Sequence, residues 1–557
     1  MTAMHAPLPR RTARALALVG LALCAFAVLA GPAAPASAHA VLASSAPVAD
    51  AVVPSAPGEV VLRFSEAVRL VPGKIRVIGP DGKRVDVGEP SVSGGTVTVT
   101  LRPGGPRGTY LVSYRVISAD SHPVAGGYTY SVGAPSTAPV DTEAGSADAE
   151  VDPFLKVAIP VAKYVGYAGL VFLVGPVLVL ALLWPGRLSR RGPARLVWTG
   201  LGLVALSTVA GLLLQAPYTT GAALSDITGA DLRQVFGSQF GTAHLIRLVV
   251  LAGAALLLVP LLRGSSGTAD RVLLLVLGVV AIGTWPMAGH PVGSPVPAVS
   301  VVVDSVHLAS MAVWLGGLVM LIAFLLRQAD DRELGAILPV WSRWAALAVA
   351  ALVLAGTTQA LIEVGTVGAL FSTAYGRLIL AKVGLFTVVI AAAAFSRRLV
   401  QRQVAAEQPG RLRRVVGVEL AITAVVLALA TVLVQTTPGR TAEATATAQT
   451  DLPFSATATS DIYSVQVDVD PAEVGRNDLH LFAYTPDGRP QPVVEWQARV
   501  ALPAAGVEPI DVPLLKLTDN HATGQFTVPT AGDWELRLTL RLSEIDQATV
   551  SVTVPVD

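Results

Sequence analysis

Residues 299–326, VSVVVDSVHLASMAVWLGGLVMLIAFLL, form the stretch of sequence that decides the fold. It is longer than the roughly 20 apolar residues that cross a bilayer as a helix, and Asp304 is its only formal charge. More apolar segments of spanning length lie on either side of it. The eight expected spans are residues 157–184, 195–216, 242–262, 271–289, 299–326, 342–362, 376–396 and 414–436. We therefore expect a multidomain membrane protein whose central part, residues 153–436, is an all-α bundle of eight transmembrane helices.

The composition agrees with a membrane protein. Hydrophobic residues make up 52% of the 557 residues and charged residues only 14%, well below the usual share in soluble domains. The formal net charge of +1 gives no basis for binding nucleic acid. The one cysteine, Cys24, lies in an N-terminal apolar run, so a chain that has lost this run has no disulfide or thiolate metal site. A metal would then be held by histidine, methionine, carboxylate or backbone groups.

The first 38 residues have the three parts of a secretory signal peptide. A basic region with Arg10, Arg11 and Arg14 precedes the apolar run ALALVGLALCAFAVLA, and the small residues ASA end at Ala38. Cleavage after Ala38 would make His39 the first residue of the mature protein. An uncleaved first membrane anchor is the alternative.

Two segments outside the bundle alternate apolar and polar residues in short runs, as half-buried strands do. Residues 39–133 contain runs such as TVTVTL and TYLVSYRVIS between the turn sequences PDGK and PGGPRG, which predicts a β-sandwich. Residues 456–557 repeat the pattern with IYSVQVDVDP and DWELRLTLRL, which predicts a second, small β-sandwich. Stretches rich in small, polar and proline residues at 134–152 and 437–455 are expected linkers.

Arginine residues are concentrated in alternate loops between the expected spans. They follow the first, third, fifth and seventh spans, for example Arg187, Arg263, Arg327 and Arg402. Because basic loops stay in the cytoplasm, this asymmetry predicts a multi-pass plasma-membrane protein with its N- and C-terminal domains on the extracytoplasmic side.

The N-terminal β segment holds a set of candidate metal ligands. A terminal His39 would offer both its α-amine and its Nδ1 atom to one ion. Asp120 and His122, in VISADSHPVAGGYTY, are two residues apart, so on a strand they would project from one face. Nitrogen-rich ligation with a carboxylate and without methionine favours Cu(II). Taken alone, Asp-Ser-His-Pro is equally typical of an ordinary turn.

These ligands lie in stretches that resemble a known family of extracytoplasmic copper-binding proteins. HAVLASSAPVADAVVPSAPGEVVLRFSEAV and YRVISADSHPVAGGYTYSV resemble CopC, which implies a cupredoxin-like β-sandwich with a Cu(II) site made of His39, Asp120 and His122. The methionine-rich Cu(I) site of some CopC proteins is missing. In the bundle, YVGYAGLVFLVGP, FGTAHLIRLVV, DSVHLASMAVWLGGL and YGRLILAKVGLF resemble CopD, the membrane partner of CopC. The whole chain resembles CopC–CopD fusions of the YcnJ type, and VDPAEVGRNDLHLF and AGDWELRLTL in its tail are similar to YtkA-like domains.

Ionisable and thioether side chains inside the expected spans are candidates for a copper route, because such groups are costly in a bilayer. Asp304, His307, Met311 and Trp314 have a spacing that puts them on one stripe of a helix. The thioether of such a stripe would suit Cu(I). Interfacial histidines that bond to loops, with methionine as packing, are the alternative. The candidate route residues are His244, Met287, His290, Asp304, His307 and Met311.

Together these observations predict a copper protein that is not an enzyme. It would capture Cu(II) outside the cell and move copper across the plasma membrane, with import the expected direction; no phosphate-binding loop points to ATP. Copper ions, the lipid bilayer and extracytoplasmic copper chaperones are the expected partners. Copper resistance by external sequestration, an oxidative polysaccharide enzyme and a haem-b electron-transfer bundle are the alternatives. The only histidines of the tail, His480 and His521, are expected at solvent-exposed strand or loop positions, in a domain that serves as a copper relay or a docking module.

Overall fold

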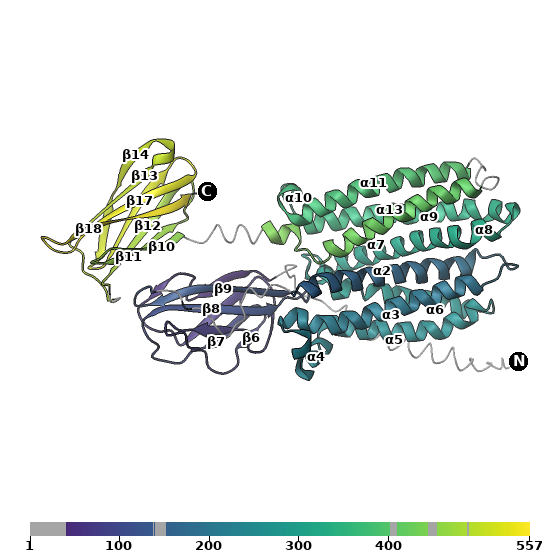
Figure 1. The fold of residues 1–557 in the computed structure, drawn as a ribbon, viewed down its shortest axis with the longest axis horizontal. Coiled ribbons are helices and arrows are strands. Elements are labelled where there is room, and N and C mark those ends of the chain that lie inside the picture. The colour runs from purple at the N-terminus through teal and green to yellow at the C-terminus, as the bar shows by residue number, and fades with distance from the viewer. Residues whose placement is uncertain are drawn as a thin grey trace, which may run out of the picture. The chain divides into compact units, whose positions relative to one another are not determined.

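The computed structural model describes residues 40–136, 139, 152–401, 409–443, 454–486 and 489–556. The chain divides into two compact units, one with the helices and residues 117–123, the other with two β domains. In Figure 1 the purple strands belong to the N-terminal β domain, the teal and green ribbons to the helical bundle, and the yellow strands to the C-terminal β domain. The predicted signal peptide, His39 and most of the linker expected at 134–152 lie outside the described residues.

Eight helices of the described chain are long and apolar enough to cross a membrane, which confirms the expected number of spans. The first four are α2 (Pro153–Leu182), α3 (Arg191–Thr220), α5 (Gln239–Leu262) and α6 (Thr268–Gly283), the last prolonged by the 3-10 turn η2 (Pro286–Ala288). The other four are α7 (Pro297–Met320), α9 (Asp331–Val364), α11 (Ala374–Gln401) and α13 (Pro409–Leu433). The π turn η4 (Leu321–Leu325) and α8 (Leu326–Gln328) continue α7, while η1 (Leu224–Asp226), α4 (Gly229–Phe236), η3 (His290–Gly293) and α10 (Ala369–Ser372) are short connecting helices.

Capping residues explain where several spans begin and end. Helix α9 starts at Asp331, earlier than its apolar run, because Asp330 and Glu333 form a reciprocal capping box around the first turn. Asp152 accepts a hydrogen bond from the N–H of Phe154 at the start of α2. Helix α3 ends at Gly221, whose left-handed φ of 70° a residue with a side chain would rarely adopt.

Helix α7, which carries most of the stretch 299–326, lies in the interior of the bundle. It packs chiefly against α2 and α9 and also contacts α6 and α13. Gly175 of α2 and Gly316 of α7 allow the two backbones to meet, since a Cβ atom at Gly175 would lie 2.5 Å from Gly316 Cα. Such close approach of small residues is a main source of helix association in lipid. Trp314 of α7 is 2% exposed, so the stripe predicted on this helix faces protein.

Ion pairs join loops at each end of the bundle. Arg187, after the first span, lies 3.1 Å from Asp330 and 2.6 Å from Glu333, after the fifth. Arg440, after the eighth span, lies 3.3 Å from Glu363, near the end of the sixth. Arg187 thus joins segments that follow odd-numbered spans, and Arg440 joins segments at the ends of even-numbered spans. This is the arrangement expected when successive spans alternate in direction.

The N-terminal β domain contains two sheets around one core, which confirms the predicted β domain. The sheets have the orders β1-β3-β7-β6 and β2-β9-β8-β4, with β5 paired to β8. Val60, Leu62, Val112 and Tyr130 are buried in the core that the sheets share. The strands are β1 (Leu42–Ala46), β2 (Val52–Val53), β3 (Glu59–Phe64), β4 (Arg69–Leu70), β5 (Arg76–Ile78), β6 (Ser91–Ser93), β7 (Thr96–Thr100), β8 (Gly108–Ile117) and β9 (Pro123–Val132).

The C-terminal β domain also has two sheets and its own core. Their orders are β10-β11-β12-β16-β15 and β14-β13-β17-β18, and Val467, Leu481 and Trp534 are fully buried between them. Strand β10 begins inside the linker expected at 437–455, and residues 439–443 of that linker are helical. The elements are β10 (Phe454–Thr459), β11 (Ser464–Asp470), β12 (Gly475–Tyr484), β13 (Glu495–Leu502), η5 (Pro503–Ala505), β14 (Val507–Val512), β15 (Leu514–Thr518), β16 (His521–Val528), β17 (Gly532–Arg541) and β18 (Gln547–Val556).

Candidate metal centre

Asp120 and His122 lie in the turn between β8 and β9, so the expectation that strand alternation brings them together is wrong. A tight reversal of the chain does so instead. The N–H of Ser118 donates to the carbonyl of His122 at 2.9 Å, and the N–H of Ser121 donates to the carbonyl of Ser118 at 3.0 Å. Ser121 has a φ of 70°, in the left-handed region that sharp turns use. The sequence Asp-Ser-His-Pro therefore forms a turn, and the same turn contains two candidate metal ligands.

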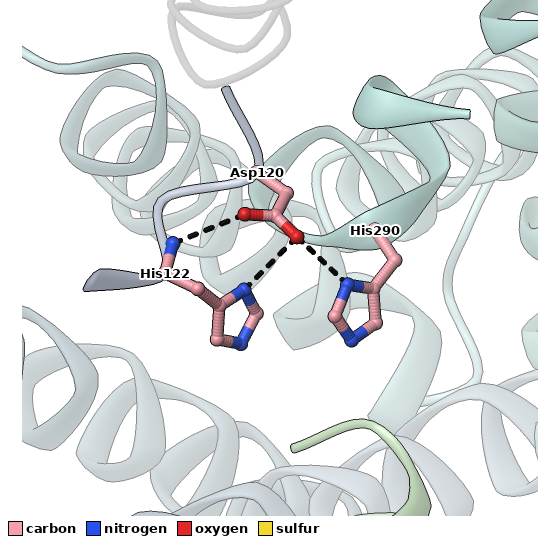
Figure 2. A group of neighbouring side chains, drawn as sticks. All are labelled: Asp120, His122 and His290. Atoms are coloured by element: carbon pink, nitrogen blue, oxygen red, sulfur yellow. Dashed lines mark hydrogen bonds and ion pairs between the residues drawn. The ribbon is translucent and has the colours of Figure 1, made fainter. Parts of the chain in front are cut away.

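The carboxylate of Asp120 connects this turn to a histidine of the bundle (Figure 2). Its Oδ1 atom accepts hydrogen bonds from the N–H of His122, at 3.1 Å, and from the hydroxyl of Ser118. Its Oδ2 atom lies 3.2 Å from Nδ1 of His122 and 2.9 Å from Nδ1 of His290. The two imidazole rings are stacked, with centroids 4.7 Å apart and planes 10° apart. All three residues are buried.

This arrangement fits a transition-metal ion. Asp120, His122 and His290 each offer one ligand atom, and these atoms lie within 4.8 Å of one another. Ligand atoms about 2 Å from one ion, set at right angles, are about 2.8 Å apart, close to the observed N–O separations. Two imidazoles and a carboxylate are a donor set that suits Cu(II) and Zn(II) more than Mg or Ca, and the carboxylate offsets part of the charge of a dication.

His290 opens the 3-10 turn η3, just after the fourth span. We expected it on the membrane route and not beside Asp120. Burial lowers the pKa of His290 below its usual value, even though the hydrogen bond to Asp120 acts in the opposite direction. The ring is therefore neutral near pH 7, the form that ligates metals.

Two residues near the end of α3 hold the turn. Nε2 of Gln215 donates to the carbonyl of Ser121 at 2.8 Å, and the ring of Tyr218 meets the ring of His122 edge-on, with centroids 6.0 Å apart. Sequence reasoning missed both residues. The available signal was a glutamine inside an apolar span, because an amide that is buried, as Gln215 is, needs a polar partner.

A cavity of about 730 Å³ extends from this centre into the helical bundle. Asp120, His122 and His290 line it, together with residues from all eight spans. All four members of the predicted stripe on α7 line the same cavity, namely Asp304, His307, Met311 and Trp314, and His244 of α5 lines it as well. Met287 is buried but is not among the described residues that line it.

The two histidines deeper in the bundle are oriented by backbone carbonyls. Nδ1 of His307 lies 3.2 Å from the carbonyl of Leu352, and Nδ1 of His244 lies 2.8 Å from that of Phe240. In each ring Nδ1 then carries the proton, and Nε2 keeps its lone pair for a ligand. Gly356 makes room for His307, because a Cβ atom there would lie 3.0 Å from Cε1 of that ring.

Two charged side chains in the cavity, Arg247 and Asp304, have polar or aromatic partners. Nε of Arg247 donates to Thr284 Oγ1 at 2.8 Å, and its guanidinium lies 4.2 Å from the centre of the Trp285 ring. Asp304 accepts a hydrogen bond from Gln359. These contacts fix the positions of the Arg247 and Asp304 side chains among the histidines and Met311. Ionisable groups inside a bundle are expected to have such partners.

Family comparisons agree with this architecture. The CopC domain model matches residues 42–133, which include Asp120 and His122. The model for the copper resistance protein D-like N-terminal domain matches residues 154–294, and the model for copper resistance protein D matches residues 335–433.

Matches to individual proteins also include copper resistance proteins of the C type and of the D type. The copper transport protein CutJ of Bacillus subtilis is 26% identical over 411 residues, 70% of this chain and 73% of its own length. Copper resistance protein D of Pseudomonas syringae is 30% identical over 40% of this chain and 77% of its length, and copper resistance protein C of Escherichia coli is 32% identical over 21% and 99%. The crystal structure of CopC from Methylosinus trichosporium, with 30% identity, covers 17% of this chain and 93% of its own, at a TM-score of 0.15. The predicted resemblance is confirmed: the chain belongs to the CopC–CopD family, with a CopC domain and a copper resistance protein D membrane domain joined in one polypeptide.

Proposed function

We propose that this chain binds copper at Asp120, His122 and His290 and moves it across the plasma membrane through the cavity of the bundle. The observation that carries this proposal is the position of His290. Its Nδ1 atom lies 2.9 Å from Asp120, and the same residue lines the cavity that also contains His244, His307 and Met311. The imidazole of His290 thus belongs both to the capture centre, which consists of Asp120, His122 and His290, and to the start of the route.

His39 is proposed as a further ligand of the captured ion. As a mature N-terminus it would add an amine and an imidazole nitrogen to the carboxylate and two imidazoles already described, a set that favours Cu(II). This part of the proposal rests on the signal-peptide pattern and on the CopC match to residues 42–133.

Copper leaving the capture centre needs successive ligands, because a bare ion is strongly disfavoured inside a bilayer. His307 and Met311 are one helical turn apart on α7, about 6 Å along its axis, and both line the cavity. The imidazole suits either oxidation state of copper. The thioether suits Cu(I), which the captured Cu(II) would become only by taking one electron from a reductant outside this chain. We propose that copper passes from His290 to His244 and His307 and then to Met311.

The proposed direction is inward, with both β domains outside the cell. The arginine-rich loops support this orientation, since they follow the odd-numbered spans, and the ion pairs of Arg187 with Asp330 and Glu333 join two of these loops. The relatives named for copper transport and copper resistance support transport and not catalysis.

Copper accumulation by cells that express the chain tests the proposal. Cells with the wild-type protein should accumulate copper faster than cells with His307→Ala at equal amounts of inserted protein, while the purified variant keeps its Cu(II) binding. Equal accumulation, with copper held at the cell surface, would instead support resistance by sequestration. A Soret band in the purified protein would favour the haem-b alternative.

A further inference from the structure

The C-terminal β domain contains two histidines that the proposed copper route does not use. His480 of β12 and His521 of β16 lie on adjacent antiparallel strands, where His480 is paired with Thr523 and Phe482 with His521. Nδ1 of His480 lies 3.2 Å from Nε2 of His521, and the ring centroids are 5.4 Å apart. The two residues are 41 positions apart, so the sheet creates this pair.

The pair lies on the polar face of its sheet. Strand β11 places Asp468 directly opposite His480, and residues opposite each other on neighbouring strands share a face. Residues that alternate with them, such as Val467 and Leu481, point to the buried core. Asp468, His480 and His521 are all half-buried.

Neighbouring groups hold both the acid and the rings in place. Asp468 accepts hydrogen bonds from Ser455 at 2.6 Å and from Gln466 at 3.0 Å. The ring of Phe482 stacks on that of His521, with centroids 4.1 Å apart and planes 17° apart. Burial, followed by the neighbouring His480, lowers the pKa of His521, while Asp468 acts in the opposite direction.

We propose that His480 and His521 form a second copper-binding site, with Asp468 as the negative charge beside it. Two ligand atoms about 2 Å from one ion lie about 2.8 to 3.3 Å apart in right-angled and tetrahedral geometries, and the observed nitrogens are 3.2 Å apart. Imidazole sites favour Cu(II) over the other divalent metals of its row. The inference rests on the proposed function only for the choice of copper as the metal.

A site with two protein ligands leaves coordination positions for water or for a ligand from another copper carrier. It would therefore hold copper reversibly, and the C-terminal domain would act as a relay and not only as a docking module. This gives a chemical role to the two histidines that we expected at exposed positions.

Chemical protection tests the site in the unaltered chain. The full-length protein in detergent is stripped of metal and treated with diethylpyrocarbonate, which modifies neutral imidazoles, with and without added Cu(II). Mass spectrometry of peptides should show that copper protects both His480 and His521. Equal modification of both residues with and without copper would overturn the proposal and leave the pair as a hydrogen bond across the sheet.

Substitutions then separate this site from the capture centre. His480→Asn and His521→Asn should each lower the copper content by about one ion per chain relative to wild type, as loss of a ligand from a two-histidine site requires. Gln525→Asn, at an exposed position on the same face of β16, should leave it unchanged. An unchanged copper content in both histidine variants would reject the second site. A lower copper content in Asp120→Asn would then show that the capture centre binds copper independently of His480 and His521.

Discussion

Oδ2 of Asp120 lies 2.9 Å from Nδ1 of His290, although the two residues are 170 positions apart in the chain. Asp120 comes from a turn of the CopC domain and His290 from the loop after the fourth span. A fusion of the two domains in one polypeptide keeps these groups at a high effective concentration, so copper need not pass through free solution between capture and entry.

The space next to His307 gives the first prediction. Gly356→Ala would place a methyl group 3.0 Å from Cε1 of His307 and displace the ring. Copper uptake should fall, because the ring of His307 has to move by a few tenths of an ångström from its ligand position. Gly278→Ala is the matched control, since nothing lies within 4 Å of a Cβ atom there. Both alanines favour helix, so equal loss of uptake in the two variants would contradict a role for His307.

Met311 and Met320 lie on the same helix and differ in their surroundings. Both are buried, but only Met311 is among the described residues that line the cavity. Met311→Leu keeps the volume at a cost below about 1.5 kcal/mol and removes the thioether. It should slow copper uptake by cells, while Met320→Leu should not. If Met311→Leu transports copper at the wild-type rate, the sulfur is packing and not a ligand.

Gln215 should control the order of the ligand turn. Gln215→Met removes the hydrogen bond to the carbonyl of Ser121, a loss of about 1 kcal/mol for one neutral bond. Hydrogen exchange at residues 118–122 should become faster, and Cu(II) should dissociate faster from the full chain. Exchange that stays at the wild-type rate would show that other contacts fix the turn.

Orientation can be measured with introduced cysteines. Arg191 and Ser225 are both exposed, and they lie at opposite ends of the second span. In intact cells Ser225→Cys should react with an impermeant thiol reagent and Arg191→Cys should not. The reverse pattern would place the arginine-rich loops outside and would reverse the proposed direction of transport.

Much of the architecture could be predicted because its signals are local. Apolar runs of spanning length and strand alternation depend on neighbouring residues, so the eight spans and both β domains were expected. The sixth span began earlier than predicted because the capping box at Asp330 and Glu333 prolongs the helix beyond the apolar run. Because the first turn of such a helix is polar, the hydropathy of the sequence does not reveal it.

The candidate centre could be predicted only in part. Asp120 and His122 were visible as neighbours in sequence, but their convergence comes from a left-handed turn at Ser121 and not from a strand. The approach of His290, the support from Gln215 and the pairing of His480 with His521 join residues 170, 94 and 41 positions apart. Contacts over such separations depend on tertiary packing, which one sequence without homologues does not reveal. The role of His39 stays a prediction, as do the signal peptide and the likeness of the tail to YtkA-like domains.

The most direct test of the account compares His290→Asn with Val292→Ala, a control in the same 3-10 turn that is not among the described residues lining the cavity. The purified His290→Asn chain should still bind Cu(II) through its remaining ligands, but more weakly than the wild-type chain, because one direct ligand is lost. Copper uptake by cells should fall to background in His290→Asn at saturating copper and remain at the wild-type rate in Val292→Ala. Uptake by His290→Asn at the wild-type rate, with normal insertion, would contradict the claim that His290 transfers copper from the capture centre into the membrane.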